Sequence, residues 1–470
     1  MKSKSLLLLP LTFLLSLTSC QTGFKSNLKY VVKSKVNKIR NENYLNISQT
    51  TYDSYYEFAK TFASLSFNKQ EKEESFGVSI PDAYICLSII AVISTEKAQK
   101  EVLDFLNLSS LEELKTAVKE IVATLATLEK VDNKHSSDNG KLFGGFNLNS
   151  IWFDPLQVEL KDKDPELYSD LANLFDASII NEALTTKGAN DYLKENGLAD
   201  LPTPEVELDD SNPSALSVMS AYYCMDHFGD YKTENYKKQY QSGNHKINYF
   251  VNNKEEMVDY IKTTDYSNVY VGNSFVGAPM KINRLNVDYF LPNEKELMPS
   301  AIVDDVLKDN YVFKTGLAKS QKDENETLET TEHRVTIKAP YFSIDNKIEL
   351  NSVSLHDYLP LLTGERCGLG ERLVTPKASE MLPDPYLFLD KIQQFSTMRF
   401  NYDGFYSSSV TIASMVYGSA GSLWIHPTFQ LDLTHPYLFK VQKNVRVDNN
   451  SEFKKLPLVI GEIVEPNYRD

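Results

Sequence analysis

The stretch that decides the fold spans residues 392–439, near the end of the chain. It reads IQQFSTMRF at 392–400, NYDGFY at 401–406 and SSSVTIAS at 407–414, and it returns through LDLTHPYLF at 431–439. The first and last of these segments have the alternation and the aromatic or β-branched residues of strands. A long connection of small and hydroxyl residues lies between them. Because small residues that favour strands fit a pleated sheet, we expect this connection to enter a sheet under some condition.

The rest of the chain predicts a mixed fold. Apolar residues recur at helical spacing over Tyr52–Phe67 and Ser110–Leu128. An apolar run over Ala83–Ile93 indicates a buried helix, which Asp82 is placed to cap. Strand patterns dominate from residue 247 onward. Helices followed by strands, rather than the two in alternation, favour an α+β fold.

Two polar segments are expected to have no catalytic or ligand-binding role. Ser320–His333 is acidic and rich in threonine, and we expect it to be an exposed loop insertion. Asp226 and His227 follow a predicted strand and are expected to form a surface pair. None of the seven histidines stands at metal-ligand spacing from another ligand residue, and no nucleophile elbow or phosphate-binding loop occurs. We therefore expect no catalytic residue, no metal and no cofactor.

The N-terminus has the pattern of an export signal. Lys2 and Lys4 precede a short apolar run, and Leu17-Thr18-Ser19-Cys20 matches the bacterial lipobox, in which the cysteine is acylated and becomes the first residue. The run is too short to serve as a permanent membrane span. We expect Cys20 to carry acyl chains such as palmitate and to hold the protein on the extracellular face of the cell membrane. The alternative is an ordinary signal peptide that is cut at another site.

These patterns divide the chain into three parts. Residues 1–19 are the predicted lipoprotein signal peptide, residues 20–48 a polar lipidated tether, and residues 49–470 the folded domain. The net charge of −15 argues against nucleic acid as a partner and against electrostatic adhesion to anionic lipid. We expect a monomer that is attached to the membrane only through Cys20.

Short motifs in a fixed order connect the chain with a known family. The chain resembles the serpins over residues 52–466, and the following segments recur in family order: Phe76–Ala83, Glu101–Leu108, Ala189–Leu193, Leu216–Tyr223, Val287–Glu294, Ile337–Ile344, His435–Phe439 and Gly461–Pro466. The resemblance implies helices packed around a large mixed or antiparallel central sheet, two smaller sheets, and an exposed reactive loop at about residues 404–430. Together with the lipobox, it suggests a serpin made as a bacterial lipoprotein.

The resemblance also implies a mechanical activity. In serpins a target protease cuts the exposed loop, and the cut loop inserts as a strand into the large sheet while the protease is still attached. The chain departs from the family at three points. Gln394 stands where the family usually has a histidine beneath the sheet opening, and Ser220 replaces a family asparagine. The loop is also longer than in typical members.

The predicted hinge of the loop begins at Gly404, which supplies the freedom to turn into the sheet. In the register of the family Phe405, Ser407, Ser409 and Thr411 then face inward. The serines and the threonine are small enough for the space beneath covering helices. Phe405 is large, and overpacking there is expected to cost roughly 1–3 kcal/mol and to slow the first step of insertion.

The sequence leaves the cleaved bond open. Counting from the hinge glycine at family spacing leads to Tyr417 and Gly418, and Met415 is a further candidate. Because the loop is long, Leu423 and Trp424 stay as alternatives.

Two functions follow as hypotheses. The first is a cell-surface inhibitor that traps a serine or cysteine protease by loop cleavage and strand insertion. The second is a serpin-fold surface lipoprotein that does not inhibit and acts as a binding or adhesion protein, for which Phe405, Tyr406 and the long loop argue. Other surface lipoproteins, such as solute-binding components, form a third class, although no hinge pattern between two lobes is visible.

Overall fold

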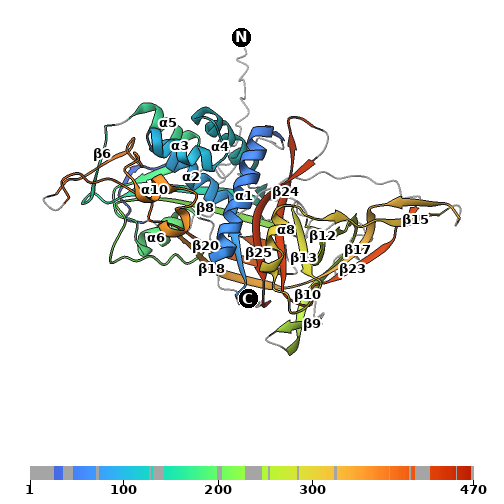
Figure 1. The fold of residues 1–470 in the computed structure, drawn as a ribbon. Helices are drawn as coiled ribbons and strands as arrows, with labels where there is room; N and C mark the ends of the chain where they lie inside the picture. Colours follow the sequence, from blue (N-terminus) through green and yellow to red (C-terminus); the bar gives the residue numbers. More distant parts are fainter. Residues whose placement is uncertain are drawn as a thin grey trace, which may run out of the picture.

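In the part of the chain that the structure describes, the strands form three larger sheets, a three-stranded arm and a two-stranded pair, and a group of helices lies beside them (Figure 1). The computed structural model describes residues 26–34, 46–69, 74–125, 129–130, 142–162, 164–197, 204–227, 246–251, 254–282, 285–321, 325–379, 382–401, 404–407, 424–450 and 453–466. The helices of the first half gather at one end of the molecule, and most strands of the second half form the other end.

Sheet A has eight strands and is mixed. From edge to edge its order is β1 (Tyr30–Val32), β7 (Ala177–Ile180), β5 (Leu142–Phe153), β8 (Leu216–His227), β21 (Gly404–Ser407), β20 (Lys391–Asn401) and β18 (Phe342–Asn351), with β4 (Glu129–Lys130) paired to β5. Strands from both ends of the chain therefore meet in one sheet.

Sheet B packs its strands into the main core, and sheet C adjoins it. Sheet B has the order β14 (Val312–Phe313), β11 (Tyr270–Val271), β12 (Phe275–Lys281), β13 (Asn286–Pro292), β24 (Tyr437–Val447), β25 (Phe453–Ile463) and β3 (Phe76–Ser79), with β2 (Asn46–Ile47) paired to β24. Sheet C has the order β23 (Thr428–Asp432), β17 (Glu332–Pro340), β10 (Lys254–Asn268) and β9 (Lys246–Val251).

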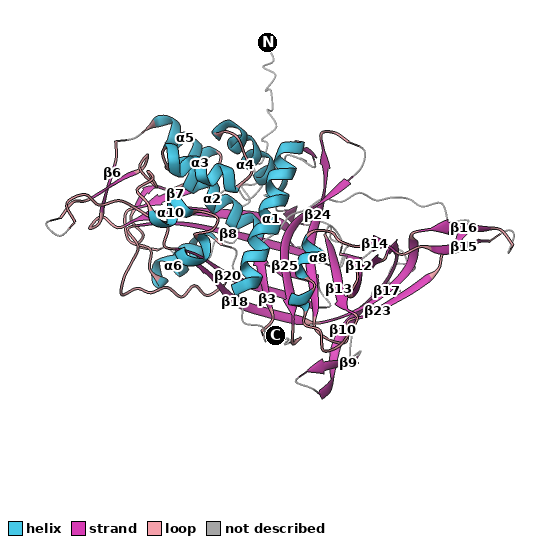
Figure 2. Cartoon of the chain, in the orientation of Figure 1, coloured by secondary structure: helices cyan, strands magenta, loops and turns pink. Residues whose placement is uncertain are grey.

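Two small sheets complete the strands. The arm consists of β16 (Thr327–Thr330), β15 (Gly316–Ser320) and β22 (Trp424–Ile425), and a further pair joins β19 (Val374–Pro376) to β6 (Val158–Leu160). Figure 2 shows β15 and β16 projecting from the strand-rich end of the molecule. The predicted loop insertion at 320–333 is therefore wrong in part, because its threonine-rich residues pair with β15 as a strand.

The helices cover the sheets. They are α1 (Gln49–Lys69), α2 (Ile80–Ile93), α3 (Glu96–Phe105), α4 (Leu111–Leu125), α5 (Pro165–Asn173), α6 (Thr186–Asn196), the 3-10 helix η1 (Pro299–Ala301), α8 (Val303–Leu307), α9 (Ser352–Leu355) and α10 (Pro360–Gly364). Together with the sheets they confirm the predicted α+β class.

Helix α2 is buried almost all round, as its nearly continuous apolar sequence requires. It begins at Ile80, with Ser79 at the N-cap position and Pro81 in the first turn. The prediction that Asp82 caps this helix is wrong. Proline favours the first turn of a helix, so the helix begins ahead of Asp82 and leaves that carboxyl inside the first turn.

Helix α6 lies over the other face of sheet A, where a second core cluster forms. Trp152 of β5 and Tyr192 of α6 meet edge to face there, with ring centroids 6.1 Å apart. The Tyr192 hydroxyl donates to the Asn149 carbonyl of β5 at 2.8 Å. Sheet A is thus enclosed between α2 on one face and α6 on the other.

The N-terminal segment differs from a simple tether. Within the range predicted as tether, Tyr30–Val32 form β1 and Asn46 pairs with Arg446 in sheet B. Backbone pairing makes these contacts, so a polar composition does not prevent them. The boundaries at residues 19 and 48 stay predictions.

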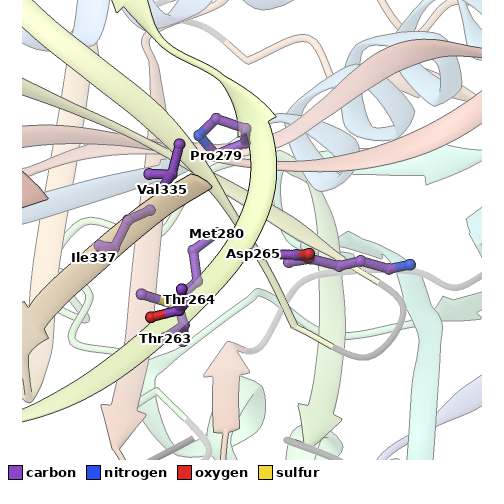
Figure 3. A pocket seen from close by; sticks show the side chains of 8 residues that line it. Thr263, Thr264, Asp265, Pro279, Met280, Val335 and Ile337 are labelled. Atoms are coloured by element: carbon purple, nitrogen blue, oxygen red, sulfur yellow. The ribbon is translucent and has the colours of Figure 1, made fainter. Parts of the chain in front are cut away.

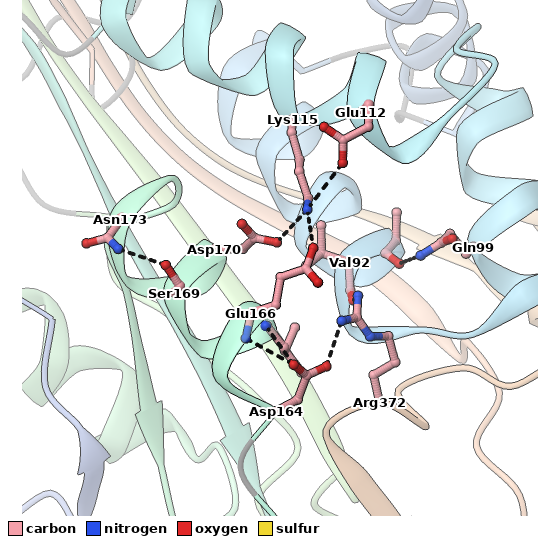
Figure 4. Close-up of polar contacts among 12 residues, drawn as sticks. Val92, Gln99, Glu112, Lys115, Asp164, Glu166, Ser169, Asp170, Asn173 and Arg372 are labelled. Atoms are coloured by element: carbon pink, nitrogen blue, oxygen red, sulfur yellow. Dashed lines mark hydrogen bonds and ion pairs between the residues drawn. The ribbon is translucent and has the colours of Figure 1, made fainter.

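Lys115 of α4 is the cation at the centre of an acidic cluster that joins α4 to α5 (Figure 4). Its ammonium lies 2.9 Å from Glu166, 3.0 Å from Asp170 and 3.5 Å from Glu112, and its side chain is 17% exposed. The single positive charge therefore screens three carboxylates from one another.

We expect Lys115→Met to lower the free energy of unfolding by about 1 kcal/mol, because it removes the cation that contacts all three carboxylates. Chemical unfolding at low and high salt measures the effect, which should shrink as salt screens the repulsion. Lys100→Met is the matched control, since it breaks an exposed pair with Asp104 on α3 and should cost less. Equal losses in the two variants would contradict the interpretation.

Candidate functional site: the opening in sheet A

The candidate site is the opening in sheet A between β8 and β20. β21 lies in this opening and pairs antiparallel with both neighbours, from Gly404 opposite His227 to Ser407 opposite Cys224. Over the strand residues that the structure describes, β8 and β20 pair with β21 and not with each other. The beginning of the predicted loop is therefore already a strand of the sheet.

Phe405 occupies the first inward position of β21. Its side chain is fully buried in the main core, and in the strand register it lies between Phe400 of β20 and Asp226 of β8. The direction of the side chain is the one that the alternation predicts. In this structure Phe405 already lies within the sheet, and its expected effect on the rate of insertion stays a prediction.

The other predicted site residues divide between described and undescribed parts of the chain. Gly404 and Ser407 form the two ends of β21. The remainder lie outside the described residues: Ser409, Thr411, Met415, Tyr417, Gly418 and Cys20. The roles of all these residues stay predictions.

A polar bridge, formed by Gln394, Ser79 and Asp82, joins β20 to the start of α2. The Gln394 amide accepts from the Ser79 N–H and donates to the Ser79 carbonyl, both at 2.7 Å. Its nitrogen also lies 3.3 Å from each carboxylate oxygen of Asp82. Further along α2, the Cys86 sulfur lies 3.7 Å from the Val218 carbonyl of β8. One helix therefore contacts both strands that flank the opening.

Asp82 is a titratable group beneath the opening that sequence reasoning missed. Burial raises its pKa to about 7, although hydrogen bonds from Ser79, from the helix backbone and from Gln394 act to lower it. The carboxyl therefore changes charge near neutral pH. The sequence signal that could have identified Asp82 is its position as an acidic residue directly after Pro81 within an apolar run.

Asp226 has a different place from the one predicted. It is 1% exposed, and its Oδ2 accepts from the Leu285 N–H at 2.9 Å. The prediction of a surface pair with His227 is therefore wrong, because β8 continues through both residues. The alternation with the inward Tyr222 and Cys224 was the signal that places Asp226 in the core.

From residue 424 onward the chain pairs with the arm and with sheet C. Trp424 and Ile425 pair with Ser320 and Lys319 of the arm, and β23 runs parallel to β17 in sheet C. His426 Nε2 lies 3.3 Å from the Glu332 carboxylate. Residues 408–423 thus connect one end in sheet A with another end in the arm.

A small pocket lies between sheets B and C (Figure 3). It is lined by Thr263, Thr264, Asp265, Pro279, Met280, Lys281, Val335 and Ile337. Its volume of about 10 Å³ is room for about one water molecule. Burial raises the pKa of Asp265, and nearby Lys281 acts to lower it. The pocket is too small for an organic ligand.

Among the residues that the structure describes, no helix has the length and the apolar content to cross a membrane. In the same residues, no group of three or more His, Cys, Asp or Glu side chains is arranged to hold a metal ion.

Several solved structures with a similar fold are serpins. AtSerpin1 of Arabidopsis, in its native stressed conformation, has a TM-score of 0.61 at 17% identity and covers 88% of this chain and 98% of its own. Native tengpin, a thermophilic serpin, has a TM-score of 0.60 at 13% identity and covers 94% of this chain and 100% of its own.

Thyroxine-binding globulin in complex with thyroxine is also similar. Its TM-score is 0.57 at 10% identity, and the match covers 89% of this chain and 99% of the globulin. The sequence itself matches no family model and no curated protein. At these identities the likeness establishes the fold, and this chain has the serpin fold.

We expect Asp82→Asn to flatten the pH dependence of stability. The folded pKa of about 7 lies above the unfolded value, so the folded state keeps its proton as the pH rises. The contribution of Asp82 is fully present below about pH 4 and is lost as the pH rises through about 7, a total of about 4 kcal/mol. Chemical unfolding at a series of pH values from 4 to about 8 measures it.

Glu462 provides the comparison for this titration. Burial raises its pKa to about 8, so Glu462→Gln should remove a separate part of the same pH dependence. If Asp82→Asn kept the full slope of the parent chain, the buried titration of Asp82 would be disproved.

We expect Phe405→Ala to lower the free energy of unfolding by about 3–5 kcal/mol, because it leaves a cavity in the main core. Denaturant titration measures the loss. Phe388→Ala is the matched control, since Phe388 is 53% exposed and its truncation should change stability little. A loss below about 1 kcal/mol for Phe405→Ala would mean that β21 does not occupy sheet A in solution.

Proposed function

We propose that this chain is a serpin-type protease inhibitor, which traps a serine or cysteine protease by cleavage of its loop and insertion of the cut strand into sheet A. The observation that carries the proposal is β21. Four residues of the hinge pair with strands on both sides, and the inward Phe405 is buried. Because β21 already lies in the opening, its extension by the residues after Ser407 is the next step of the proposed mechanism.

The proposed step is mechanical and draws on backbone pairing. Each residue that enters between β8 and β20 gains hydrogen-bond partners on two sides. In the intact chain the far end of the loop is held by β22 and β23, which limits how far the segment can enter. Cleavage removes that restraint, so the cut strand can carry an attached protease along the sheet. No side chain of this protein has to act as a catalyst.

The proposal also covers the bond that the target protease cleaves and the location of the inhibitor. Tyr417-Gly418 is the leading reactive bond, and Tyr417 suits the pocket of a chymotrypsin-like protease, with Met415 as the next candidate. The lipobox at Cys20 supports attachment to the cell membrane on the extracellular face.

A second candidate is a serpin-fold binding or adhesion protein that does not inhibit. The fold is compatible with this role, since the structurally similar thyroxine-binding globulin was solved in complex with thyroxine. The aromatic Phe405, where the resemblance leads us to expect small residues, also favours it. The small volume of the pocket between sheets B and C speaks against an organic ligand at that place.

Incubation of the protein with a panel of serine proteases separates the two candidates. For an inhibitor we expect an adduct that survives denaturing electrophoresis, together with a released fragment that begins near residue 418. Clean cleavage without an adduct, and without a gain in thermal stability, would support the second candidate instead.

A pair of loop variants makes this test specific for insertion. Ser409 is predicted to face inward and Ser408 outward, so Ser409→Arg places a charge in the core while Ser408→Arg places it in solvent. We expect Ser409→Arg to be cleaved without an adduct and Ser408→Arg to form the adduct normally. Equal adduct yields from the two variants would argue against strand insertion.

A further inference from the structure

The N-terminal segment at residues 26–34 is part of sheet A. β1 is the edge strand of that sheet and pairs antiparallel with β7, with Tyr30 opposite Ile180. The Asn181 N–H also donates to the Lys29 carbonyl at 2.9 Å. This segment therefore closes the edge of the sheet, although it lies within the stretch whose composition predicts a tether.

Three side chains of the segment converge on one carboxylate of α6. Ser26 Oγ, Tyr30 Oη and Lys33 Nζ all donate to Glu195, the Tyr30 contact at 3.0 Å, and the Glu195 side chain is 13% exposed. Burial acts to raise the pKa of Glu195, but hydrogen bonds from Lys33, Ser26 and Tyr30 outweigh it and the pKa is lowered. We call these four residues the N-terminal clamp.

The second core cluster contains residues of α6 and of strands on both sides of the opening. Tyr192 and Leu193 of α6 pack there with Tyr223 of β8, and Phe395 of β20 packs against the same cluster. Strand entry separates β8 from β20. The apolar contacts beneath α6 therefore have to slide as the sheet widens.

We propose that the N-terminal clamp is a brake on strand insertion. It ties the C-terminal end of α6 to the edge strand β1, so that α6 cannot shift over sheet A without breaking the contacts of Glu195. Glu195 is thus a positioning residue, which acts on the opening through α6. The inference rests on the proposed insertion mechanism. Release of the clamp speeds entry of the strand, and an intact clamp slows it.

A second ion pair on the same helix supplies a matched control. Lys187 and Asp191 pair one turn apart on α6, and the Lys187 side chain is 83% exposed. Lys187→Met therefore changes the charge of α6 and breaks an ion pair without altering the clamp.

The test uses the full chain carrying Cys20→Ser, which removes the acylation site. Lys33→Glu and Glu195→Lys each place like charges at the clamp, and the double variant restores an opposite pair. Each protein is cut in the loop with thermolysin, and its gain of resistance to urea is followed over time. We expect each single variant to gain resistance about tenfold faster than the parent, the double variant to return toward the parental rate, and Lys187→Met to keep it.

The outcomes separate the clamp from the proposed function. Equal rates in the parent and both single variants would overturn the clamp. A parent chain that gains no urea resistance after the cut would instead overturn the insertion mechanism. Tyr30→Phe is the milder variant if a charge reversal prevents folding, since it removes one hydroxyl donor and keeps the ring. It should speed the gain about fivefold, and an unchanged rate would also overturn the clamp.

Discussion

The edges of β8 and β20 need a hydrogen-bonding partner, and the structure is arranged around that requirement. Buried backbone groups without partners are costly, so a strand between these two edges is favoured over an empty opening. β21 supplies the partner at the hinge end. α2 contacts both flanking strands on one face through Gln394 and Cys86, and α6 covers the other face. The hinge strand β21, helix α2 and helix α6 are therefore all arranged around the same opening.

The sequence predicts the fold and the direction of the hinge well, because both depend on periodicity. Period two along the hinge allows a single inward face, and Phe405 lies on it. The missed residues depend on context. Pro81 moves the start of α2 ahead of Asp82, and β8 runs far enough to bury Asp226. β1 pairs through its backbone, for which the polar side chains around Tyr30 give no signal.

The polar bridge changes which group senses pH beneath the opening. The resemblance leads to a histidine on β20, which would gain a charge as the pH falls. Gln394 makes its hydrogen bonds as a neutral amide at any physiological pH. The titratable group lies instead on α2, where burial gives Asp82 a pKa of about 7. This chain therefore gains a negative charge at the opening as the pH rises.

The strands that follow the loop have a consequence for a severed molecule. β23 lies beside β17 in sheet C, and β24 lies between β13 and β25 at the centre of sheet B. The last part of the chain is thus held in the core by strand hydrogen bonds and apolar contacts. A nick between residues 408 and 423 would not divide the particle. The two polypeptides would sediment and elute as a single species, and the shorter one would dissociate only when the protein unfolds.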